Sequence, residues 1–240
     1  MAKIKRSGLV DEACSAIKEM LMNGDIRPGD PILEVSMSNK LQMSRTPVRE
    51  ALFRLEMEGF VKNIDGRIRT VVEVSPQDLR EIYEIREFME GMAARLLAPH
   101  IRKNQLDYLM KLAQQLDNSG DISDEEEGKF HEYLITECGN KRLSQFASLA
   151  HDLWVWISLG DGAHMQELTD NRKHIKISHV SIVQALADHD PDRAEALTRA
   201  HLVEAKEQLN NFRFPARRFN RAGDVGKEVV AKKNVDRKSE

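Results

Sequence analysis

The dipeptide Asp65-Gly66 separates two short runs rich in β-forming residues, 61–64 and 67–72. An Asp-Gly pair between such runs is the strongest short-range signal for a β-hairpin. Three short helical segments come before it, at residues 9–22, about 34–42 and 44–59. Three helices followed by a hairpin predict a winged helix-turn-helix, and we expect this domain to span residues 8–74.

The first two helices are predicted from their apolar spacing and from the residues that interrupt them. Leu9 begins a series of apolar residues spaced four apart that ends at Leu21, which places the series on one helical face. Pro28-Gly29 then forces a turn. In the second helix, Val35 and Met37 are expected to face inward.

The third helix carries most of the side chains that are expected to contact DNA. Ser44 is a favourable N-cap residue, and Pro47 is tolerated in a first turn, where the backbone N–H lacks a helical partner. In helix-turn-helix proteins the start of the recognition helix enters the major groove, where arginine can donate two hydrogen bonds to guanine. The residues expected to contact DNA are Ser44, Arg45, Thr46 and Arg49 on this helix, with Arg67 and Arg69 beside the wing tip.

The alternative is that these are ordinary arginines on a solvated surface. The distribution of charge favours DNA, although the net charge is −3. Residues 1–73 carry 12 basic and 11 acidic side chains, residues 74–212 carry 15 and 24, and residues 213–240 carry 9 and 4. A near-neutral head on an acidic body fits a chain in which only the head meets a polyanion.

Beyond Ser75-Pro76 the pattern is helical throughout, with no extended β-like run, and an all-α helical bundle is predicted for residues 76–214. Residues 215–240 are basic and poor in large apolar groups, which predicts a disordered tail. The fold class is therefore mainly α. The helices are expected at about 76–98, 103–118, 122–137, 141–159, 163–187 and 191–211.

The head resembles the GntR family of bacterial regulators. The segments that carry the resemblance are residues 24–29, 44–52 and 55–61. The resemblance implies that Arg45 and Arg49 contact bases and that Thr46 and Gly66 support phosphate and wing contacts. Some members carry a base-contacting arginine early in the second helix. Val35 stands at that position here, so we expect it to add no specificity.

A glutamate and three histidines of the body are candidate metal ligands. Glu127 and His131 are four residues apart and so share one helical face. His179 and His201 lie in two later helices, and mixed carboxylate and imidazole ligands suit zinc, nickel or another divalent first-row metal. From spacing alone, a solvated contact within the helix is the more common role for such a Glu–His pair.

The body resembles the FCD effector domain, the all-helical partner of one large GntR subfamily that includes FadR-like regulators. Residues 78–90, 130–134, 139–143, 179–186 and 194–201 carry this resemblance. It implies a divalent metal held by one carboxylate and three histidines, with a small organic acid beside it. Carried over by position, the ligands are Glu127, His131, His179 and His201, although the family usually has Asp at the first of these.

Three further residues of the body are interpreted from their side chains. Arg86 is assigned either to a carboxylate effector or to a salt bridge within the domain. Trp154 and Trp156 lie in an apolar helix, which predicts a role in the core or in a pocket wall. His164 and His174 are left out of the metal set.

These patterns predict a homodimeric transcription regulator, a repressor or else an activator, that binds palindromic operator DNA and responds to a small carboxylate. Two cysteines far apart and the lack of a long apolar run predict a soluble, cytoplasmic chain without disulfides or membrane spans. Two alternatives keep the metal: the same DNA-binding dimer with a purely structural ion, or a metal-dependent enzyme. No nucleophile–base pair or phosphate loop supports catalysis, and no catalytic residue is assigned.

Overall fold

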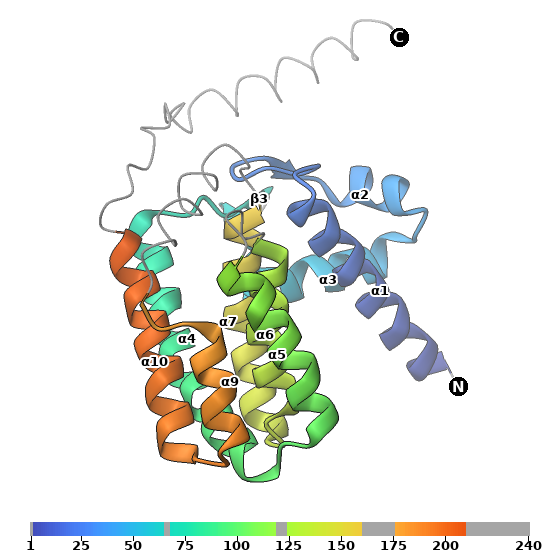
Figure 1. The fold of residues 1–240 in the computed structure, drawn as a ribbon. Coiled ribbons are helices and arrows are strands. Elements are labelled where there is room, and N and C mark those ends of the chain that lie inside the picture. The colour runs from blue at the N-terminus through green and yellow to red at the C-terminus, as the bar shows by residue number, and fades with distance from the viewer. Residues whose placement is uncertain (1, 65–67, 119–123, 160–175, 210–240) are drawn as a thin grey trace, which may run out of the picture.

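The computed structural model describes residues 2–64, 68–118, 124–159 and 176–209. They form an N-terminal head of helices and a small sheet, ending near residue 74, and a helical body from residue 76 onward (Figure 1). The described residues are therefore mainly helical, which confirms the predicted fold class. No described helix is long and apolar enough to cross a membrane.

The head contains three helices and a three-stranded antiparallel sheet with strand order β1-β3-β2. Val61 is paired with Val71 across the predicted hairpin. The strand β1 was not predicted, because its two residues lie directly after a turn; Pro31 is paired with Thr70 in β3. The elements are α1 (Ala2–Met22), β1 (Pro31–Ile32), α2 (Glu34–Leu41), α3 (Arg45–Met57), β2 (Val61–Ile64) and β3 (Ile68–Val71).

The core of the head is built on the inner face of α3. Val48 and Leu52 on this face have no exposed surface. Gly59 then takes a positive φ of 87°, a conformation that favours glycine, and this lets the chain turn so that Phe60 is fully buried. Val35 and Met37 were both expected to face inward. Met37 is buried in the core, but Val35 is 46% exposed.

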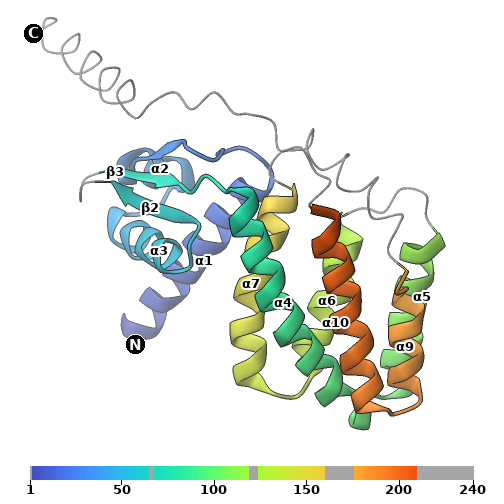
Figure 2. The same ribbon diagram turned by 90° about the vertical axis from the view of Figure 1, so that its left-hand side faces the viewer.

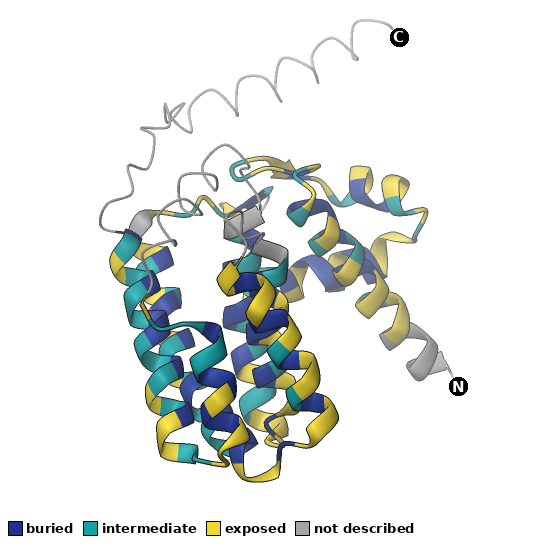
Figure 3. Cartoon of the chain, in the orientation of Figure 1, coloured by how far each residue is buried: buried dark blue, intermediate teal, exposed yellow. Residues whose placement is uncertain are grey.

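The described part of the body is helical, as expected (Figure 2). Helix α4 packs against α6, α7 and α10, while α5 packs against α6 and α9. The faces that meet in this bundle are buried (Figure 3). The elements are α4 (Pro76–Leu97), the 3₁₀ turn η1 (Ala98–His100), α5 (Lys103–Asn118), α6 (Asp124–Glu137), α7 (Lys141–Leu159), α9 (His179–Ala187) and α10 (Pro191–Gln208).

Side-chain caps fix where the body helices begin. Ser75 and Asp78 form a reciprocal capping box at the start of α4. The predicted helix over 163–187 is wrong at residues 176–178, which are not helical, because Ser178 caps α9 and the helix begins at His179. The earlier part of that prediction, with His164 and His174, lies outside the described residues, as does the predicted tail over 215–240.

Head and body meet along α7. Trp156 of α7 is 2% exposed and belongs to the apolar cluster of the head, where its ring lies 5.5 Å from that of Phe60. Lys18 of α1 is 2.8 Å from Asp152 of α7, and the C-terminal part of α1 comes close to α7 (Figure 2). The core roles expected for Trp154 and Trp156 are confirmed by their burial.

Candidate DNA-binding face and metal centre

The start of α3 presents an exposed polar surface. Ser44 is in the N-cap position with an extended backbone, but its hydroxyl makes no capping hydrogen bond. Arg45, Thr46 and Arg49 are exposed, on the side of α3 away from its buried face. The hydroxyl of Ser44 and the first backbone amides of the helix are thus left facing outward, an arrangement suited to phosphate oxygens.

Acidic side chains hold two arginines of this surface in place. Nε of Arg49 donates to Glu34 at 3.0 Å, and Arg69 donates to Glu34 at 3.1 Å and to Glu56 at 3.2 Å. Exposed ion pairs contribute little net free energy, so DNA could compete for the Arg49 guanidinium. Sequence reasoning missed Glu34, because only the fold brings the start of α2 beside α3. Gly66 and Arg67 lie outside the described residues.

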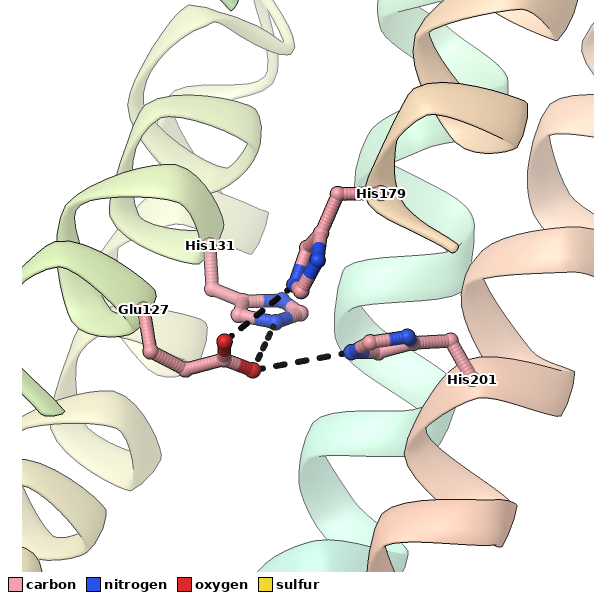
Figure 4. A group of neighbouring side chains, drawn as sticks. All are labelled: Glu127, His131, His179 and His201. Carbon is pink, nitrogen blue, oxygen red and sulfur yellow. Dashed lines mark hydrogen bonds and ion pairs between the residues drawn. The ribbon is translucent and has the colours of Figure 1, made fainter. Parts of the chain in front are cut away.

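The four expected metal ligands meet in the middle of the body (Figure 4). Glu127 and His131 come from α6, His179 from the first turn of α9, and His201 from α10. One candidate ligand atom from each lies within 4.8 Å of all the others, and all four side chains are buried. Nε2 of His131, His179 and His201 lies 3.3, 3.2 and 3.5 Å from the Glu127 carboxylate.

Two of the histidines are held from behind by a hydrogen bond of the other ring nitrogen, and that nitrogen of the third lies against a buried carboxylate. Nδ1 of His179 is 2.9 Å from Asp117, which also accepts from the backbone N–H groups of residues 179 and 180. Nδ1 of His201 is 2.8 Å from the carbonyl oxygen of Ile177, and Nδ1 of His131 is 2.6 Å from Glu90. Such contacts fix the tautomer of a metal-binding histidine and aim Nε2 at the ion.

The charges of the cluster are tightly coupled. Burial alone would raise the pKa of Glu127, but the charge of His179 and the close approach of all three imidazoles hold it well below its usual 4.5. Burial opposes protonation of His179, yet Glu127 and Asp117 raise its pKa to about 9. Burial and the charge of His179 lower the pKa of His201. Without an ion, the cluster is a buried Glu127–His179 ion pair.

The residues present fit a divalent transition metal. Nε2 of His179 and of His201 is buried without a hydrogen-bond partner among the described residues. Buried polar atoms normally have partners, so convergent unsatisfied nitrogens beside a carboxylate indicate a ligand that is itself a cation. Three imidazole nitrogens and one carboxylate suit zinc, nickel and similar ions. Glu127 has a longer side chain than the Asp usual at this position, and its carboxylate still faces all three histidines.

A second polar group lies behind His131. Arg86 is 1% exposed, and its Nε donates to Glu90 at 2.6 Å, so it forms the salt bridge within the domain that was one of its two expected roles. Burial would raise the pKa of Glu90, but Arg86 and His131 lower it to about 2. Sequence reasoning missed Glu90 and Asp117. The spacing of Arg86 and Glu90 is a helical i,i+4 pair and could have revealed the first of them.

His151 of α7 is a fourth buried histidine near this group. Its side chain is 5% exposed, and its Nδ1 has no hydrogen-bond partner among the described residues. Burial and the nearby charge of Arg86 lower its pKa to about 3, so this ring is neutral. Sequence reasoning did not single out His151, because no spacing relates it to the four candidate metal ligands.

An exposed basic helix start beside a wing, joined to a helical body with a buried polar cluster, defines a DNA-binding regulator. The comparisons with known families agree. Residues 9–72 match the bacterial regulatory proteins of the gntR family, and residues 81–204 match the FCD domain. The chain belongs to the GntR family and carries a C-terminal FCD domain, as the sequence resemblance implied.

Curated relatives are transcription regulators rather than enzymes. The Nta operon transcriptional regulator of Aminobacter aminovorans is 28% identical over 196 residues, 79% of this chain and 89% of the relative. The regulator McbR of Escherichia coli K12 is 28% identical over 198 residues, 79% of this chain and 87% of the relative. The solved structure of E. coli McbR/YncC has the same fold, with a TM-score of 0.62 at 23% identity over 85% of this chain and 97% of that one.

Proposed function

We propose that this DNA-binding regulator acts as a homodimeric repressor whose operator affinity is set by a small organic acid, bound at or beside a divalent metal in the body. The observation that carries the proposal is the cluster of three aimed imidazole nitrogens around the Glu127 carboxylate. The metal would be held by Glu127, His131, His179 and His201. It would supply a Lewis-acidic centre for a carboxylate of the effector.

On the DNA, we assign base contacts to Arg45 and Arg49, phosphate contacts to Ser44 and Thr46, and wing contacts to Gly66, Arg67 and Arg69. Two heads of a symmetric dimer would read the two halves of a palindrome. The exposure of Ser44, Arg45, Thr46 and Arg49 supports the assignment, whereas Arg69 is half-buried and paired with Glu34 and Glu56.

The effector would need to bind the DNA-competent and DNA-free states with different affinity, because otherwise it shifts nothing. Arg86 is our candidate for its carboxylate. To reach an effector, the guanidinium would share or leave its bond to Glu90. Exchanging one carboxylate partner for another keeps the buried charge of Arg86 neutralised, which is the condition for such an exchange in a dry site.

The metal is tested by zinc titration calorimetry and elemental analysis of the purified protein. We expect about one ion per chain, and we expect Asp117→Asn to weaken zinc binding about 10- to 100-fold, because it removes the carboxylate that aims His179. Asp107→Asn, on the same helix and away from the cluster, serves as the matched control. A chain that binds no zinc or nickel, or an unchanged affinity in Asp117→Asn, would contradict the assignment.

A purely structural ion is the second candidate, favoured by the complete burial of the cluster. Chelation separates the two. Loss of the folded state on chelation indicates a structural ion, whereas loss of the thermal shift caused by small mono- and dicarboxylates, with folding intact, indicates sensing.

A further inference from the structure

Helix α7 contributes a tryptophan to each of two cores. Trp154 packs in the body with Leu79 and Leu202, and its indole N–H donates to the Tyr83 hydroxyl at 3.1 Å. Trp156 packs in the head. Residues two apart on a helix point in nearly opposite directions. The end of α7 is therefore a shared wall between head and body.

On the body side, buried contacts run from the metal centre to Trp154. Nδ1 of the ligand His131 is 2.6 Å from Glu90, and Glu90 is paired with Arg86 at 2.6 Å. The Arg86 guanidinium lies over the Trp154 ring at 4.1 Å from its centre. None of these four side chains is more than 1% exposed. A buried charge cannot shift without its partners adjusting, so a change at His131 reaches α7.

On the head side, α7 contacts the residues that follow α3 and a lysine of α1. Trp156 lies against Phe60, which follows the turn that ends α3. Nζ of Lys18 is 2.8 Å from Asp152 on α7 and 2.9 Å from Glu58, the residue that caps α3. The orientation of α3, and with it the DNA-contacting surface, is thus tied to α7.

One feature of this contact makes it suited to release. The indole N–H of Trp156 is buried without an acceptor among the described residues. A buried donor without a partner is unfavourable, and water would supply the missing acceptor if the head moved away, which offsets part of the cost of exposing the ring. The Lys18–Asp152 pair is partly exposed and adds little to offset this.

We propose that Trp156 is a releasable anchor that docks the DNA-binding head on α7, and that occupancy of the Glu127–histidine cluster controls the head through this anchor. The inference rests on the proposed metal-dependent function and names the part of the molecule that transmits it. Linkage requires the effect to be reciprocal, so loosening the anchor must alter metal affinity.

The two tryptophans are the only ones in the chain, so each can be observed separately. The full-length protein is labelled with 5-fluorotryptophan, and its two ¹⁹F signals are assigned from the Trp154→Phe and Trp156→Phe variants. Zinc is then added to the metal-free protein. We expect both signals to move with one equivalent of zinc, although Trp156 touches none of the ligands.

A Trp156 signal that stays in place while calorimetry shows zinc bound would overturn the anchor and leave the metal site standing. Absence of zinc binding would overturn both proposals. The two failures are therefore distinguishable.

The reciprocal test uses calorimetry on variants of α7. Trp156→Ala is expected to change the dissociation constant for zinc at least fivefold, the lower end of typical coupling between sites. Phe146→Ala, an exposed position on the same helix, is the matched control and is expected to leave it within twofold. If Trp156→Ala fails to fold, Trp156→Phe replaces it. A zinc affinity changed less than fivefold in the folded variant would sink the proposal.

Discussion

The head and the body place their functional side chains in opposite environments. In the head, Arg45 and Arg49 are exposed, and the core beneath them is apolar. In the body, Glu127 and the histidines are themselves buried in the core. Binding and stability are therefore separable in the head, where a side chain can be removed without opening the core. They are linked in the body, where Glu127 and His179 also neutralise each other in the core.

The largest expected effect comes from removing the buried carboxylate. Structural zinc sites bind with about 10–16 kcal/mol, so one of four ligands accounts for about 3 kcal/mol, a hundredfold or more in affinity. We expect Glu127→Ala to lose at least this much zinc affinity by calorimetry. It should also lower the melting temperature of the metal-free protein, since it leaves the charge of His179 without this partner. An unchanged melting temperature would break the link between binding and stability in the body.

The pH dependence of the metal-free protein comes next. The pKa of His179 is raised to about 9 from 6.5, so its contribution to stability is complete below about pH 6.5 and is lost as the pH rises through 9. The contribution is about 3 kcal/mol at most. We expect the EDTA-treated protein to melt at a lower temperature at pH 9 than at pH 6, and Glu127→Gln to reduce this difference. Equal melting temperatures in the unaltered protein would show that no such ion pair forms.

In the head, Arg49→Ala is expected to weaken operator binding by about 1–3 kcal/mol and to relax base preference. The probe is a duplex selected in vitro by the unaltered protein, with affinity measured by fluorescence anisotropy at fixed salt. Because Arg49 is exposed, the melting temperature should not change. Arg102→Ala, an exposed arginine of the body, is the control. Unchanged selectivity would contradict the assignment of the recognition helix.

The smallest effect is expected from Glu34→Gln. This change keeps the shape of the side chain but removes the charge that holds Arg49 and Arg69. We expect operator affinity to change by less than about 1 kcal/mol, since the Arg49 side chain is exposed and Arg69 keeps its second partner, Glu56. A larger loss, measured with the same duplex, would show that Glu34 positions the two arginines for DNA and would sharpen the contrast with the body.

The sequence allowed prediction of the parts of the fold that depend on local patterns. The hairpin strands followed from an Asp-Gly pair between β-rich runs, and the start of α3 followed from Ser44. The start of α9 at His179 was missed, because Asp117 of a distant helix and the cap Ser178 together accept from its first backbone amides. Strand β1 was missed for a similar reason: two residues carry no periodicity, and only pairing with β3 defines them.

The residues of the candidate site also fall into those that the sequence could predict and those that it could not. The four residues of the buried cluster could be predicted, because resemblance to the FCD domain supplied positions that spacing alone left open. The side chains that aim the histidines, Asp117 and Glu90, could not. Their role depends on the packing of α5 and α4 against other helices, which no local pattern encodes. The position of Trp156 in the core of the other domain is of the same kind.

That last position has a consequence for synthesis of the chain. Phe60 is made long before Trp156 and has no indole to cover it until α7 has emerged and folded. The nascent head therefore passes through a stage in which part of its core is uncovered. A fragment cut at residue 74 would stay in that stage permanently, and we expect it to aggregate more readily than the whole chain. The head and the body look like two separate domains, but the core of the head is complete only when Trp156 of the body packs into it.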